Sequence, residues 1–209
     1  MRFVCISDTH EQQGSFDIPD GDVLIHAGDL TWEGQPDRIK RAIDWLRKLP
    51  HKFKVVIGGN HDFDFYKYCG TSSIDFNILN NGGVSINGFN IWGSPVTPTF
   101  GGWAFMKDRG DEISEVWKQI PDNTDILITH GPPLGVLDLT PPRYGSINAG
   151  CYDLKKAVNR IKPKLHVFGH IHNGYGQLEM DGTIFVNASI CDEQYHPFNK
   201  PILVDLETK

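Results

Sequence analysis

The chain has 209 residues, of which 39% are hydrophobic and 22% are charged, and its formal net charge at pH 7 is −6. These values are typical of one globular domain, expected here to span residues 1–209, and they exclude a disordered, fibrous or low-complexity protein. The acidic balance gives no general attraction to nucleic acid or to an anionic membrane, so we expect neither as a partner. The oligomeric state stays open.

The four cysteines, Cys5, Cys69, Cys151 and Cys191, show no CxxC spacing. Two of them lie among apolar or small residues, as buried thiols do, and we expect all four to be reduced. The N-terminal segment lacks the pattern of a signal peptide, and no apolar stretch is long enough to cross a membrane. The sequence therefore predicts a cytoplasmic protein.

Short apolar segments, each bounded by Gly, Pro or Asp, predict buried strands at intervals along the chain. They cover residues 3–6, 22–26, 53–57, 125–129 and 164–168. Between and after them, apolar residues at helical spacing predict amphipathic helices. These helices cover residues 36–49, 111–120 and 152–161. The alternation of strands and helices indicates an α/β fold, while residues 62–69 fit either a helix or a strand.

Further strand candidates are joined by tight turns at Asn87-Gly88 and Asp181-Gly182, which are hairpin signals. They cover residues 84–87, 89–93, 176–180, 184–188 and 202–206. Either one mixed sheet or two sheets packed face to face, with helices outside, accommodates both the crossovers and the hairpins. Two long Gly- and Pro-rich segments, residues 93–102 and 131–150, are predicted to be functional loops.

Side chains that bind metals follow each of the first five strands. The segments are Asp8-Thr9-His10, Gly28-Asp29, Gly59-Asn60-His61-Asp62, His130 and Gly169-His170-Ile171-His172. Ligands bind outside the carboxyl ends of the strands in open α/β sheets, so these segments are predicted to converge on one site. Asp8 and His10 are two residues apart, as are His170 and His172, so in extended backbone each pair points to one side.

The donor types narrow the choice of metal. Carboxylate, imidazole and amide groups without a thiolate favour manganese, iron or zinc. The set is large enough for two ions, and two ions roughly 3.5 to 4 Å apart can bind both the attacking and the leaving oxygen of a phosphoryl displacement. An aspartate can bridge such a pair with its two oxygens.

The ordered pattern D-x-H, G-D, G-N-H-D, H and G-H-x-H resembles the calcineurin-like metallophosphoesterase superfamily, and within it the metallophosphoesterase-domain-containing proteins. The resemblance implies a two-sheet β-sandwich of mixed strands flanked by helices. It also implies that Asp8, His10, Asp29 and His172 bind one metal, whereas Asp29, Asn60, His130 and His170 bind the other. Some members of the subfamily carry glycine at the position of His170, which weakens their second site, but this chain keeps the histidine.

The same resemblance implies a phosphodiesterase for cyclic nucleotides or similar small phosphodiesters, in which a hydroxide that bridges the metals attacks the phosphorus. His61 would stabilise charge and protonate the leaving oxygen, and Asp62 would orient His61. Two alternatives remain open. One is a phosphomonoesterase, because the same metals serve both reactions, and the other is a weakly catalytic, metal-bound scaffold.

Several further polar residues lie outside the metal-binding segments. Arg143 and Tyr144 lie in the loop after His130, where a cation and an aromatic ring can contact a phosphate and a base, so we predict that they bind substrate. His26 and His166 lie inside apolar strands and are predicted to be core histidines hydrogen-bonded to neighbours. The role of His196 stays open.

Overall fold

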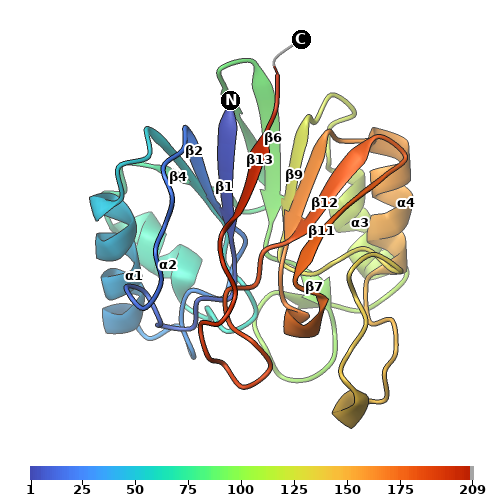
Figure 1. The fold of residues 1–209 in the computed structure, drawn as a ribbon. Coiled ribbons are helices and arrows are strands. Elements are labelled where there is room, and N and C mark those ends of the chain that lie inside the picture. The colour runs from blue at the N-terminus through green and yellow to red at the C-terminus, as the bar shows by residue number, and fades with distance from the viewer. Residues whose placement is uncertain (208–209) are drawn as a thin grey trace.

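Two β-sheets packed face to face form the centre of the fold in the computed structural model, which describes residues 1–207 (Figure 1). Helices cover the outer face of each sheet, so the expected two-sheet sandwich of mixed strands is confirmed. In the described part of the chain, no helix has both the length and the apolar character needed to span a membrane.

The first sheet has the order β13-β1-β2-β3-β4. Its strands are β1 (Arg2–Ile6), β2 (Val23–His26), β3 (Phe53–Val56), β4 (Asn77–Ile78) and β13 (Ile202–Asp205). Strands β1 to β4 run parallel, and β13 pairs antiparallel with β1. Strands β1 and β2 are buried on both faces along almost their whole length, which explains why they appear in the sequence as continuous apolar segments.

The second sheet has the order β11-β12-β10-β9-β6-β5. Its strands are β5 (Gly82–Ile86), β6 (Phe89–Ser94), β9 (Ile126–Thr129), β10 (Leu165–Phe168), β11 (Gly176–Met180) and β12 (Thr183–Asn187). Both predicted hairpins are present, because β5 pairs antiparallel with β6 and β11 with β12. Their turns place Asn87, Gly88, Asp181 and Gly182 at positive φ, as a type I′ turn requires.

Two helices pack on each outer face. Helices α1 (Pro36–Lys48) and α2 (Phe65–Thr71) cover the first sheet, and α3 (Asp111–Lys118) and α4 (Tyr152–Ile161) cover the second (Figure 1). The segment that fitted helix or strand thus contains the start of α2. The loop after β6 contains a short strand, β7 (Thr97–Pro98), which pairs with β8 (Met106–Lys107).

Three apolar clusters hold these layers together, one between the sheets and one behind each sheet. Ile25, Ile91 and Val167 belong to the cluster between the sheets. Behind the first sheet, Ile43 and its neighbours on α1 pack against the strands, and a corresponding cluster lies under α3 and α4. Burial of apolar side chains is the main favourable term in folding, so these clusters hold the sheets and helices in place.

The carboxyl ends of the strands that precede the ligand segments all lie at the lower end of Figure 1. The two sheets are joined there, because Ser7 N–H donates to Ala188 O at 2.9 Å and Ile190 N–H donates to Ser7 O at 2.8 Å. These hydrogen bonds hold the end of β1 against the segment that follows β12. The ligand segments of both sheets therefore meet at one end of the sandwich.

The buried core histidine His166 makes stability depend on pH. Burial lowers the pKa of His166 to about 3, below the value near 6.5 expected in the unfolded chain. A proton therefore binds the unfolded chain first, so stability falls as the pH drops from about 6.5 towards 3. In His166→Phe, the free energy of unfolding should fall less steeply over this window, by up to about 1.4 kcal/mol per pH unit. Equal slopes in denaturant titrations of both proteins would contradict this account.

Candidate metal centre

One group of ligands joins the end of β1 to the segment after β10. His172 Nε2 lies 3.3 Å from Asp8 Oδ1 and 3.4 Å from His10 Nε2. Two nitrogens that each lie about 2.1 Å from one tetrahedral ion have a similar separation. One atom from each of the three side chains lies within 4.8 Å of the others. These residues therefore fit a common cation.

The backbone presents these side chains in an unexpected way. Asp8 and His10 were expected in extended backbone, but their φ angles are 51° and 40°. The segment coils because Asp8 N–H donates to Gly28 O and His10 N–H donates to Asp29 O. The expected convergence is present, but the reason given for it was wrong, because the side chains are aimed by left-handed backbone and not by strand periodicity.

The second group lies around Asp29. His130 Nε2 lies 3.3 Å from Asp29 Oδ2 and 2.9 Å from Asn60 Oδ1. Asp29 Oδ2 also lies 3.7 Å from His10 Nε2, so this one atom faces both groups. Asp29 Oδ1 instead accepts the N–H of His61 at 2.9 Å. Asp29 Oδ2 is therefore the oxygen that lies between the two groups, while the bridging of two metals by this aspartate stays a prediction.

Backbone carbonyls orient several of the imidazoles. Each ring has Nδ1 close enough to donate to a carbonyl oxygen, which leaves Nε2 free to face the centre. The pairs are His130 with Ala27 O at 2.9 Å, His172 with Asp192 O at 2.9 Å and His61 with Trp32 O at 2.8 Å. These carbonyls belong to residues that a search for ligand-type side chains cannot find.

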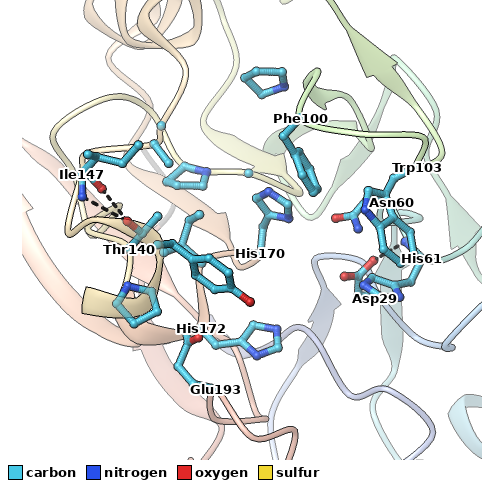
Figure 2. A pocket seen from close by; sticks show the side chains of 18 of the residues that line it. Asp29, Asn60, His61, Phe100, Trp103, Thr140, Ile147, His170, His172 and Glu193 are labelled. Carbon is cyan, nitrogen blue, oxygen red and sulfur yellow. Dashed lines mark hydrogen bonds between the residues drawn. The ribbon is translucent and has the colours of Figure 1, made fainter.

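A further set of contacts fixes Asp8. Ser189 Oγ lies 2.9 Å from Asp8 Oδ2, and the N–H of His170 donates to the same carboxylate at 3.0 Å. The His170 ring packs beside His130 and Phe100, with centroids 5.0 and 5.1 Å apart, and it lines the cavity shown in Figure 2. The backbone of His170 thus supports the group around Asp8, whereas its ring lies beside the group around Asp29.

The charges in the centre favour a cation. Burial opposes ionisation of Asp8 and Asp29, yet the surrounding histidines hold the pKa of both carboxyl groups below their ordinary value. Burial also lowers the pKa of His10 to about 4, so its imidazole is neutral at pH 7. Despite burial, contact with Asp8 raises the pKa of His172 to about 9, so a cation would replace a proton there. The buried carboxylate, imidazole and amide donors thus fit two divalent ions.

His61 lies beside the centre and at the cavity wall. One of its ring nitrogens lies within 4.8 Å of ligand atoms of His10 and Asp29. The ring packs against Trp103, with centroids 4.3 Å apart, and lines the cavity (Figure 2). With Nδ1 held by a carbonyl, the Nε2 atom is the one available to a substrate or a metal.

The expected role of Asp62 requires a correction. Its oxygens accept hydrogen bonds from the N–H groups of Leu30, Thr31 and Gly59 and from the Thr31 hydroxyl, at 2.7 to 3.1 Å. The group that orients the His61 ring is instead the Trp32 carbonyl. Asp62 therefore holds the loops after β2 and β3 together, and it acts on His61 only through the backbone.

A cavity of about 430 Å³ opens over the centre. Its floor includes Asp29, Asn60, His61, His170 and His172, and its walls include Pro98, Phe100, Trp103, Thr140, Arg143, Tyr144, Ile147, Glu193 and Tyr195. The long loops 93–102 and 131–150 both contribute to these walls. Figure 2 shows Trp103 and His61 on one side of His170, and Thr140 and Ile147 on the other.

Arg143 and Tyr144 both line this cavity, and their contact with a substrate stays a prediction. The Arg143 guanidinium donates to Glu193 Oε2 at 2.7 Å and to Glu193 O at 2.8 Å, and it lies over the Tyr144 ring. Tyr195 was not singled out, although its ring packs edge-on against His10, with centroids 4.9 Å apart. His196 has an exposed side chain and does not line the cavity.

Gly169 provides a direct test of how tightly the centre is packed. A Cβ atom at this position would collide with the Asp8 carboxylate and with the Ser7 side chain. In Gly169→Ala we therefore expect Asp8 to be displaced and metal affinity to fall at least about tenfold, as when an outer contact of a ligand is lost. Gly102→Ala is the control, because a Cβ there meets nothing within 4 Å. Unchanged metal binding in Gly169→Ala would show that the packing tolerates a shift.

The chain is similar to several known proteins. It is 43% identical to the human metallophosphoesterase domain-containing protein 1 over 234 aligned positions, which cover 99% of this chain and 71% of that protein. It is 26% identical to a 3',5'-cyclic-nucleotide phosphodiesterase of Nostoc, over 83% of this chain and 64% of that protein. Among solved structures, the protein TT1561 of Thermus thermophilus aligns with a TM-score of 0.61 and 12% identity, over 89% of this chain and 88% of that one.

The chain also matches the description of a protein family over most of its length. The sequence pattern described as calcineurin-like phosphoesterase matches residues 1–174, which include every ligand segment found at the strand ends. The clustered aspartates and histidines agree with the dinuclear divalent metal sites that such enzymes use. The chain therefore belongs to the calcineurin-like phosphoesterase family, whose members are metal-dependent phosphoesterases.

Proposed function

We propose that this chain hydrolyses small phosphodiesters, with cyclic nucleotides among the candidate substrates, using two manganese ions. The observation that carries the proposal is the position of Asp29 Oδ2, which faces His10 on one side and His130 on the other. A buried carboxylate oxygen that lies between two groups of imidazoles can serve as a ligand that two metal ions share. We assign Asp8, His10, Asp29 and His172 to one ion and Asp29, Asn60, His130 and His170 to the other.

The bound ions would supply positive charge to the phosphate and lower the pKa of the attacking water. Oxygen and nitrogen donors without a thiolate suit manganese, with iron or zinc as alternatives. The chain's own contribution is orientation, since carbonyl contacts fix the rings of His130 and His172, and Ser189 fixes Asp8. Because these groups are buried, few water molecules can compete with them for contacts to the phosphate.

His61 supplies the proton in this proposal. Its Nδ1 is held by Trp32 O at 2.8 Å, and its ring packs against Trp103, so Nε2 has a defined direction at the cavity wall. A protonated Nε2 can donate to the oxygen that leaves phosphorus, which general acid catalysis requires. Asp62 supports this geometry by holding the loop that carries His61.

The shape of the cavity favours a diester. Trp103 and Thr140 lie on opposite sides of His170, so a phosphate on the floor would have a wall to each side (Figure 2). A diester carries a substituent in both directions, whereas a monoester fills only one. The name of the Nostoc relative, a 3',5'-cyclic-nucleotide phosphodiesterase, supports the same choice. Arg143 and Tyr144 would contact one of the substituents.

The proposal is tested by comparing bis(p-nitrophenyl) phosphate with p-nitrophenyl phosphate and 3',5'-cyclic AMP on the manganese-loaded chain. We expect kcat/KM for the aryl diester to exceed that for the monoester at least about tenfold, which corresponds to about 1.4 kcal/mol of discrimination. The reverse order would indicate a phosphomonoesterase. If the metal-loaded chain turned over neither ester, a weakly catalytic scaffold would become the better account.

A further inference from the structure

Two buried pairs of histidine and threonine lie behind the ligand segments, one pair in each sheet. His26, at the end of β2, places Nε2 3.0 Å from Thr9 Oγ1. His166, in β10, places Nε2 2.8 Å from Thr129 Oγ1. All four side chains are fully buried, and none of them lines the cavity. The same contact therefore recurs in both halves of the sandwich.

The partners of Thr129 determine which atom donates in the second pair. Its hydroxyl donates its only proton to Gly131 O at 2.7 Å, so His166 Nε2–H is the donor towards Thr129. Thr129 and Gly131 flank the ligand His130. The hydroxyl thus links the residues on both sides of the ligand, and the histidine holds that hydroxyl in place.

The first pair is arranged in the same way. Gly28 N–H donates to His26 Nδ1 at 3.3 Å, so the proton of the neutral ring is on Nε2 and faces Thr9. Thr9 separates the first two ligands of the chain, and Gly28 directly precedes Asp29. His26 therefore connects the ligand segment after β1 with the ligand segment after its own strand.

We propose that His26 and His166 are positioning residues for the metal centre, each fixing a ligand segment through a hydrogen bond to its threonine. The inference rests on the proposed metal site, but it assigns a role to residues outside that site. Burial lowers the pKa of both histidines to about 3, so each can donate without adding a positive charge next to the cations. If these residues only filled the core, neither the threonine hydroxyls nor a histidine donor in both pairs would be needed.

The test is calorimetric titration of the metal-free chain with Mn²⁺. Thr9→Val and Thr129→Val keep the branched side chain but remove the hydroxyl. Each should weaken Mn²⁺ binding about tenfold, the lower end of the effect of losing a group bonded directly to a ligand, because each hydroxyl acts on its ligand through the backbone. Thr9→Ser and Thr129→Ser keep the hydroxyl and should bind Mn²⁺ nearly as the unaltered chain does. Equal losses in the Ser and Val variants would overturn the inference.

Two further variants separate positioning from stability. Thr183→Val is the matched control, because Thr183 is buried and bonded to Pro163 O at the start of β12, away from the ligand segments. It should lower the melting temperature without changing Mn²⁺ affinity. The double variant Thr129→Val with His166→Phe removes the polar groups of both side chains, so it should lose less stability than Thr129→Val, which leaves His166 Nε2–H without an acceptor. It should still bind Mn²⁺ at least about tenfold more weakly.

The outcomes distinguish this inference from the proposed function. If the unaltered chain bound two Mn²⁺ ions and the double variant bound them with the same Kd, the positioning role would be refuted while the metal site stood. If the unaltered chain bound no Mn²⁺, the proposed function would fail and the positioning role with it. Turnover is not needed for either decision.

Discussion

Asp29→Asn is expected to reduce kcat/KM for a phosphodiester by at least about 10³-fold and to lower the number of bound metal ions. The amide can keep its oxygen on the N–H of His61, where Asp29 Oδ1 accepts at 2.9 Å, so the loop geometry should survive. Its NH₂ group then replaces Oδ2, the atom between His10 and His130, and offers no lone pair to a cation. Loss of several kcal/mol of charge stabilisation corresponds to this factor.

The matched control for this substitution is Asp125→Asn. Asp125 accepts the N–H of Asn90 at 3.0 Å, next to the start of β9 and at the opposite end of the sheet from the ligands. Its substitution also removes one negative charge, but activity and metal content should stay close to those of the unaltered chain. Steady-state kinetics and elemental analysis of both variants check the prediction. Full metal content and turnover in Asp29→Asn would exclude the bridging role.

His61→Ala should reduce kcat about 10²- to 10⁴-fold while the metal content is retained. The ring is held by the Trp32 carbonyl and by Trp103, and in this account it donates a proton instead of binding a metal. The loss should be largest for poor leaving groups, because these depend most on protonation. A series of aryl phosphodiesters with leaving groups of increasing pKa, combined with elemental analysis, measures both effects.

His61 also lies close to His10 and Asp29, so a direct role as a metal ligand is the competing explanation. If His61→Ala lost one metal ion per chain, the residue would be a ligand and the assignment as the acid would be wrong. His196→Ala is the control, because His196 is exposed and lies outside the cavity. We expect His196→Ala to keep both its turnover and its metal ions.

The regular elements were largely predictable because each has a local cause. The apolar segments that became the central parallel strands are buried on both faces, and the hairpins depend on the positive φ of Asn87-Gly88 and Asp181-Gly182. Strand β4 and the pair β7 and β8 were missed because two-residue strands show no periodicity. Their pairing is decided by the tertiary structure.

The gathering of the ligand segments was predictable from strand ends, but their orientation was not. Asp8 and His10 adopt left-handed backbone because the segment coils against the loop after β2, a contact between distant parts of the chain. The carbonyls that orient the imidazoles belong to residues such as Ala27 and Trp32, whose side chains give no signal. Any residue type could provide such a carbonyl.

The walls of the cavity were the least predictable part. Arg143 and Tyr144 were proposed from their loop, but the pairing of Arg143 with Glu193 joins residues 50 positions apart. Tyr195 contacts the rings of His10 and Trp32 although its own segment carries no metal-site motif. An aromatic residue in a polar loop near the end of the chain was the only available signal, and it is a weak one.

Five strand-end segments are expected to build one centre with two metal ions that share Asp29. Anomalous diffraction from crystals grown with Mn²⁺ tests it most directly. The account predicts two peaks about 3.5 to 4 Å apart on either side of Asp29 Oδ2, one near His172 and one near His130. A single peak, or two peaks that do not share Asp29, would contradict it.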